Sequence, residues 1–288
     1  IQLTENTLAN EKLTSKQRQN LKDLNLQSKI ALGKLEKTDD LGEKNTPNYF
    51  QKAYALSIKN NELDKAISYF KKYEDAITQQ EITQRDLAKF YVEKAHLYFR
   101  MSDAEHPSED LEIANTAIET AIQTLIPTYK QGSIPNTDEL FAENTFIDIF
   151  ELIAEITIDP DEALAYYDLA FYVSNLIQGQ LTSQEAKMTN LAGDRKRSEF
   201  CLELLSDAHQ KTPTNEIFEK ALKYAEIGKA EVLSSNFEKK SLLAKHPKDT
   251  LLLREKELLQ KQEQLTHLMV NSIKKNDSLS KQLLATSV

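Results

Sequence analysis

The chain has 288 residues, of which only six are glycine and seven are proline, too few turn-forming residues for a fold built from β-hairpins. Hydrophobic residues make up 40% and charged residues 28%, enough to bury a core and solvate a surface, so we expect an all-α folded protein. The net charge of −9 repels nucleic-acid phosphates, and no run approaches the roughly 18 apolar residues of a membrane span, so neither nucleic acid nor a membrane span is expected.

Residues 1–46 predict one long polar helix that runs from about Asn10 to Leu35. We expect this helix to end near Gly33 or in the polar loop 39–45, because glycine commonly closes a helix. The segment is predicted to be an N-terminal capping helix or the remnant of an upstream repeat.

Residues 47–240 contain an internal repeat. In it an alanine and the residues at +4 and +7 form a series of small, large and medium-sized side chains. The four copies are Ala66-Phe70-Tyr73, Ala114-Ile118-Ala121, Ala163-Tyr167-Ala170 and a degenerate Ala221-Ala225-Gly228. The successive steps are 48, 49 and 58 residues. An amphipathic helix precedes each series, so we predict about four helical hairpins, with a longer turn over 101–110 in the second.

The third hairpin carries the clearest helix start in the chain. Asp159 supplies a capping side chain, and Pro160 follows where its missing N–H costs nothing, so a helix is predicted from about 160 to 178. The preceding segment 146–158 is rich in isoleucine, yet Asp148, Glu151 and Glu155 recur at +3 and +7. That spacing indicates a helix and not a strand.

Residues 241–288 predict a C-terminal helical linker. Leu251, Leu258 and Leu265 recur every seven residues, with lysine and glutamate between them. We expect either a helix packed along the last repeat or a helical hairpin that closes near Asn276.

A small residue early in the second helix of a hairpin lets the first helix approach closely, and stacked hairpins then bury what one hairpin cannot. The segment from Asn61 to Phe70 resembles the second helix of a tetratricopeptide repeat. The spacing here exceeds the family's 34 residues, and Phe50 stands in place of its first-helix tryptophan. The resemblance implies a TPR-like α-solenoid; an irregular helical bundle is the alternative.

A second resemblance covers the end of the repeat region. The segment 218–233, followed by the leucine-rich segment 246–258, is similar to the last repeat of bacterial tetratricopeptide proteins that end in a CHAT domain, a caspase-like peptidase module. The resemblance implies a regulatory or partner-binding region that precedes a peptidase domain absent from this chain.

In tetratricopeptide solenoids the first helix of each hairpin lines a concave groove. Carried onto this sequence, that geometry predicts six partner-binding residues, namely Gln51, Lys59, His96, Arg100, Asp148 and Glu155. Lys59, His96 and Arg100 would make the early groove basic, while Asp148 and Glu155 would make the later groove acidic. A peptide with the opposite order of charges would then bind in one direction.

Residue patterns for catalysis were sought as well. Cys201 lies in a helical stretch and His209 follows eight residues later, too far along one helix for a thiolate–imidazole pair. The other histidines lack partners at metal-site spacing, and the six glycines are too scattered for a phosphate loop. We therefore predict no enzymatic activity, no metal and no cofactor, and interpret Cys201 as a buried small hydrophobe.

One cysteine cannot form an internal disulfide, which favours a reducing compartment such as the cytoplasm. The chain begins at Ile1, so we expect it to be a piece of a longer protein whose leader would lie outside it.

The leading hypothesis is a non-catalytic protein–protein interaction scaffold whose partners are a protein or peptide and the downstream caspase-like domain. Residues 101–170 hold 16 acids and one base, which is either a solvated surface or a site for a basic segment. The alternative hypothesis is a structural module that self-assembles through the leucine-rich C-terminal helix.

Overall fold

A computed structural model of the chain describes residues 13–35, 41, 44–79, 81–102, 107–181, 183–227, 241–242 and 244–271. Within these residues the chain forms α-helices and one short 3₁₀ helix, Thr137–Glu139, and contains no β-strand. The prediction of an all-α fold is confirmed. None of the described helices is both long and apolar enough to cross a bilayer.

The chain divides into two compact units, residues 1–125 and 126–288. The described helices of the first unit are α2 (Ser15–Ala31), α3 (Pro47–Lys59), α4 (Leu63–Ile77), α5 (Gln84–Ser102) and α6 (Pro107–Leu125). Those of the second unit are α7 (Asn144–Ile156), α8 (Pro160–Gln180), α9 (Gln184–Lys211), α10 (Asn215–Ile227) and α12 (Thr250–Asn271).

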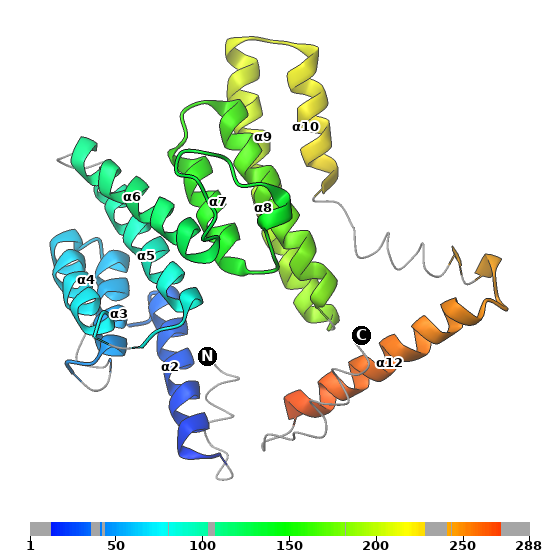
Figure 1. Ribbon diagram of the computed structural model, residues 1–288, viewed down its shortest axis with the longest axis horizontal. Coiled ribbons are helices and arrows are strands. Elements are labelled where there is room, and N and C mark those ends of the chain that lie inside the picture. The colour runs from blue at the N-terminus through cyan, green and yellow to red at the C-terminus, as the bar shows by residue number, and fades with distance from the viewer. Residues whose placement is uncertain are drawn as a thin grey trace. The chain divides into compact units, whose positions relative to one another are not determined.

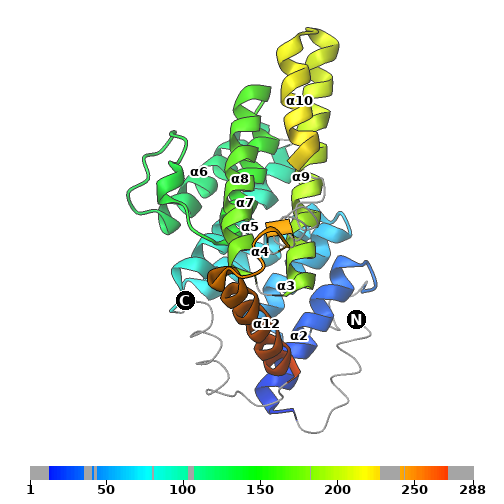
Figure 2. The ribbon, with the colours of Figure 1, turned by 90° about the vertical axis from the view of Figure 1, so that its right-hand side faces the viewer.

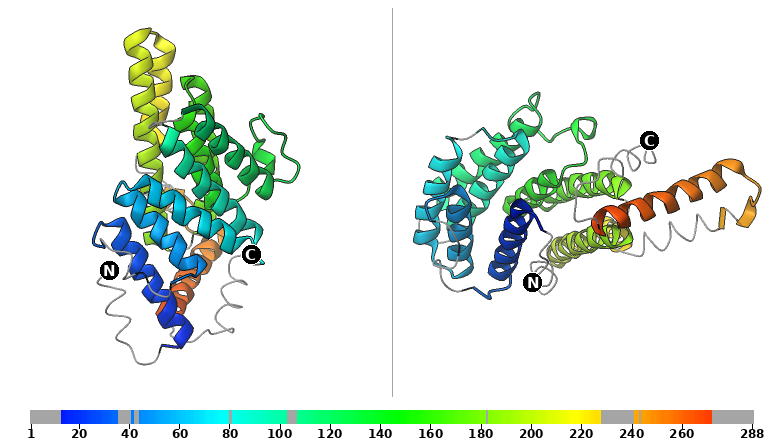
Figure 3. Two further views of the ribbon diagram at one scale, coloured as in Figure 1. Left: turned by 90° about the vertical axis from the view of Figure 1, so that its left-hand side faces the viewer. Right: turned by 90° about the horizontal axis from the view of Figure 1, so that it is seen from below.

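Adjacent helices pack in pairs within each unit. In the first unit α3 packs against α4 and α5 against α6, and Figure 3 shows the two light-blue helices α3 and α4 side by side. In the second unit α7 packs against α8 and α9 against α10. Figures 1 and 2 both show α9 and α10 running antiparallel as a hairpin. The predicted pairing of neighbouring helices is therefore present.

Local sequence signals fix several helix ends. The Asp159 side chain accepts a hydrogen bond of 2.9 Å from the backbone N–H of Glu162, and Pro160 occupies the first position of α8, as predicted. Thr46 caps α3 in the same way, with Pro47 at its start. The 146–158 segment forms α7, so its prediction as a helix is also confirmed.

The alanines that begin the repeat series lie inside the packed helix pairs. Ala66, Ala114 and Ala163 each have 0% exposed surface, and the residues at +4 and +7 in these three copies are buried too. A side chain with a single methyl group allows backbones to approach closely at these positions. The predicted burial of the three well-formed copies is confirmed.

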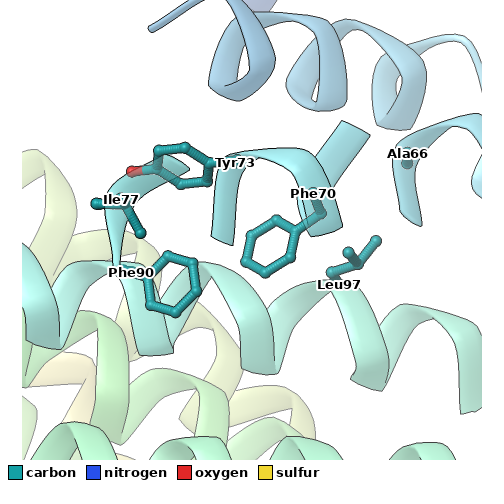
Figure 4. Close-up of a cluster of buried hydrophobic side chains, with 6 residues drawn as sticks. All are labelled: Ala66, Phe70, Tyr73, Ile77, Phe90 and Leu97. Atoms are coloured by element: carbon teal, nitrogen blue, oxygen red, sulfur yellow. The ribbon is translucent and has the colours of Figure 1, made fainter. Parts of the chain in front are cut away.

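The core of the first unit joins α4 to α5 through aromatic rings. Phe70 stacks on Phe90 at a centroid distance of 5.3 Å, and Tyr73 meets Phe90 edge-on at 5.6 Å. Figure 4 shows Phe70, Tyr73 and Ile77 pointing from α4 toward Phe90 and Leu97 on α5. Because Tyr54 of α3 packs edge-on against Phe70 at 5.1 Å, one cluster holds three helices.

One predicted helix end is confirmed and one predicted turn is wrong. The first helix ends at Ala31, close to the predicted end near Gly33, because Gly33 adopts a positive φ of 63° and turns the chain. The long turn predicted over 101–110 is shorter, since α5 continues to Ser102 and α6 begins at Pro107, where a proline fits the first turn of a helix.

The fourth repeat copy also departs from the prediction. Ala221 and Ala225 are only partly buried, whereas Tyr224 is 2% exposed and faces the neighbouring helices. Its ring packs against Phe171 of α8 at a centroid distance of 6.1 Å. Asn10, Gly228 and the turn expected near Asn276 lie outside the described residues.

Candidate functional site

A cavity of about 560 Å³ lies in the first unit, between α2, α3 and α5. Cavities of this size accommodate small molecules or short peptide segments. Its lining includes three of the residues predicted to face a binding groove, Gln51 and Lys59 from α3 and Arg100 from α5. The sequence-based prediction thus brought together three side chains that do share one cavity.

The wall formed by α2 is held by a buried ion pair. The Lys52 ammonium on α3 lies 2.5 Å from the Asp23 carboxylate on α2, and the Lys52 side chain is only 3% exposed. Apolar packing adds to this contact, since Ile30 of α2 belongs to one buried cluster with Tyr49 and Ala53 of α3. Lys52 is therefore part of the scaffold of the cavity.

Glu93 of α5 is a lining residue that sequence analysis missed. Its Oε1 accepts a hydrogen bond of 2.8 Å from the Gln51 side-chain amide. Its Oε2 is shielded from solvent and has no hydrogen-bond partner among the residues that the structure describes. Burial raises the pKa of Glu93 to about 7, although the Gln51 hydrogen bond and the charge of Lys89 act to lower it. The carboxyl group therefore titrates near neutral pH.

The charge of the Glu93 carboxylate affects the pKa of two tyrosines. Burial first and the Glu93 charge second raise the pKa of Tyr54 on α3 and of Tyr73 on α4 above the ordinary value. Both phenols thus stay neutral at physiological pH. Around Glu93, the carboxyl group therefore titrates near neutral pH, while the neighbouring Tyr54 and Tyr73 stay uncharged.

The basic residues lie at the opposite end. Lys59 follows Gln51 by eight residues and Arg100 follows Glu93 by seven, so both cations lie about 11 Å along the helices from the Gln51–Glu93 pair. Lys59 and Arg100 are exposed, and neither forms an ion pair with any residue that the structure describes. They are available to a ligand.

The other three predicted groove residues do not line this cavity. His96 is exposed on α5, and Asp148 and Glu155 are exposed on α7 in the second unit. Their role in binding a partner, and the predicted change from basic to acidic along one groove, stay predictions.

A second cavity, of about 420 Å³, lies between α5 and α6. Among the described residues of its lining, the only basic one is Lys94, which is already paired with Glu74 at 2.8 Å. The α2–α3–α5 cavity is the better candidate because it combines unpaired cations with a carboxylate oxygen that lacks a partner.

The second unit contains a buried polar network around Arg197 of α9. Its guanidinium lies 2.6 Å from Glu151 of α7 and 2.7 Å from Asp194 of α9, and one nitrogen also reaches the Ser174 hydroxyl of α8 at 3.3 Å. Burial acts to lower the pKa of Arg197, but the hydrogen bonds to Asp194 and Glu151 outweigh it and raise the pKa. The network joins α7, α8 and α9.

Cys201 offers no nucleophile within the described structure. The residue is fully buried in α9, and burial followed by the nearby charge of Asp168 raises the pKa of its thiol to about 12. The interpretation of Cys201 as a buried small hydrophobe is confirmed. Among the described residues there is no cluster of three or more histidine, cysteine or carboxylate side chains placed to hold a metal ion.

Comparisons with family models, with curated proteins and with solved structures gave no match for this chain.

Proposed function

We propose that this chain is a non-catalytic protein-interaction module and that the α2–α3–α5 cavity binds a peptide segment of its partner. The observation that carries the proposal is the meeting of Gln51, Lys59 and Arg100 in one cavity with Glu93. Exposed cations without ion pairs favour a ligand that carries a carboxylate. Buried helix pairs supply the rigid support that a binding site needs.

The finer fold assignment belongs to this proposal. Antiparallel helix pairs and alanines buried at intervals of 48 and 49 residues support a TPR-like α-solenoid over residues 47–240. The segment resemblance adds a downstream caspase-like domain as a partner in the full-length chain, which this module would hold in place or in check.

Peptide binding is tested by calorimetry with a library of short synthetic peptides and the double variant Lys59→Ala/Arg100→Ala. We expect the best peptide to bind this variant about tenfold or more weakly, because each charge-assisted hydrogen bond contributes roughly 1.5–3 kcal/mol. The matched control is Lys65→Ala/Lys71→Ala, which removes two exposed lysines of α4. Equal losses in both double variants would contradict a site at the cavity.

A specific observation favours a second function, self-assembly through α12. Leu251, Leu253 and Leu268 are 80%, 40% and 56% exposed, an unusual amount of apolar surface for one described helix. Under this alternative the full chain sediments as a dimer or larger species, and a chain lacking residues 247–288 sediments as a monomer.

The matched substitutions are Leu251→Ser/Leu268→Ser against Lys256→Ser/Lys261→Ser in the same helix. Only the leucine variant should lose association, since the charged lysine heads stay in water and their stems bury less apolar area than leucine side chains. Monomers before and after truncation remove the assembly function.

A further inference from the structure

The two ends of the α2–α3–α5 cavity differ in charge. We name the Gln51–Glu93 pair the carboxylate end and Lys59 with Arg100 the cationic end. The lining between them is partly buried and mostly apolar, with Tyr54, Ala55 and Ile58 of α3. A ligand that carries only negative charge satisfies the cationic end and is repelled by Glu93 when that group is ionised.

The distance between the ends restricts how a peptide can reach both. Residues two apart in an extended strand lie on the same side about 7 Å apart, and residues four apart about 13 Å apart. Residues three apart point to opposite sides. The roughly 11 Å between the ends is therefore spanned by side chains at i and i+4, since their flexible stems take up the small difference.

We infer that the cavity binds an extended peptide segment with a basic side chain and an acidic side chain four residues apart and an apolar side chain midway between them. The basic group contacts Glu93, the acidic group contacts Lys59 and Arg100, and the apolar group packs between them on Tyr54. This inference rests on the proposed peptide-binding function and specifies its ligand.

The protonation of Glu93 adds a second signature. The groups that face its carboxyl are Gln51 and Tyr54 on α3, Tyr73 on α4 and Lys89 on α5. A basic ligand group binds only the ionised carboxylate, whose pKa is about 7 without ligand. Affinity for such a ligand should therefore fall about tenfold from pH 8 to pH 6.

The test uses the full chain and a peptide set with acetylated and amidated ends, so that only side chains carry charge. The parent peptide is Lys-Ser-Leu-Ser-Glu, accompanied by the same sequence with the two charges exchanged. Three changes are then made, one at a time, to whichever of these two peptides binds more tightly. Lysine is replaced by norleucine, glutamate is replaced by glutamine, or the two charged residues are placed three residues apart. In calorimetry at pH 8 we expect each change to weaken binding about tenfold.

Variants of the protein assign each preference to its end of the cavity. Glu93→Gln should abolish the preference for lysine over norleucine and keep the preference for glutamate, while Lys59→Gln/Arg100→Gln should do the reverse. Only the first variant should lose the pH dependence. His96 is the histidine nearest to Glu93 in the sequence, three residues after it, so His96→Gln is the control that should retain the pH dependence.

Folding of the Glu93→Gln variant is checked by its thermal midpoint. The folded chain raises the pKa of Glu93 above its unfolded value of 4.5, so this group costs stability as pH rises from about 4.5 through about 7. At pH 8 the variant should therefore melt no lower than the parent.

The outcomes separate this inference from the proposed function. If all peptides bind equally, or Glu93→Gln weakens all of them alike, the assignment of ligand charge is wrong while peptide binding stands. If the library peptides bind at Lys59 and Arg100 but this set does not, the inferred ligand is again wrong, while the proposed peptide-binding function stands. If neither set binds, the proposed function fails together with the inference.

Discussion

Replacing Arg197 by methionine should destabilise the second unit by about 3–5 kcal/mol, the usual cost of removing one partner from a buried ion pair. The Asp194 side chain is 5% exposed and would keep a charge without its partner at 2.7 Å. Methionine fills similar volume, so loss of charge compensation and not a cavity dominates. Glu151 is 38% exposed and loses less, because water screens it.

Urea denaturation followed by circular dichroism measures this cost, and hydrogen exchange in α8 and α9 assigns it to the second unit. The matched control is Arg195→Met two residues earlier, where the side chain is 73% exposed and pairs with exposed Glu199. That change should cost no more than about 1 kcal/mol. The double variant Arg197→Met/Asp194→Asn should recover part of the loss, since no buried charge then lacks a partner. Equal costs for the two arginine variants would show that the network contributes nothing special.

Replacing Phe70 by alanine should destabilise the first unit by about 3–5 kcal/mol. The ring is 1% exposed and contacts the rings of Tyr54, Tyr73 and Phe90 on three helices. Its removal leaves a cavity that three packed helices cannot close without shifting. Because Tyr54 also lines the α2–α3–α5 cavity, peptide binding should weaken in the same variant.

The matched control for this change is Phe218→Ala on α10, where the ring is 67% exposed. The same atoms are removed there from a mostly solvated position, so the cost should stay below about 1 kcal/mol. Thermal unfolding and hydrogen exchange in α4 and α5 measure the difference. A similar cost at both positions would mean that Phe70 is not part of a tightly packed core.

Two important polar residues escaped prediction for the same reason. Glu93 follows the buried Phe90 by three residues and precedes the buried Leu97 by four, so it lies on the buried stripe of α5. Arg197 follows Asp194 by three residues, one turn later on α9. A charged residue on an apolar stripe is a sequence signal for a buried polar site. The partners of these two residues, Gln51 for Glu93 and Glu151 for Arg197, come from helices that are distant in the sequence.

Helix positions, the cap at Asp159 and the burial of Ala66, Ala114 and Ala163 were determined by the sequence alone, because capping and amphipathic spacing act within one or two turns of a helix. The choice of Tyr224 over Ala221 as the buried residue of α10, and the meeting of Glu93 with Gln51, were decided by tertiary structure. Both depend on which side of one helix faces another, and only packing between segments far apart in the chain sets that contact.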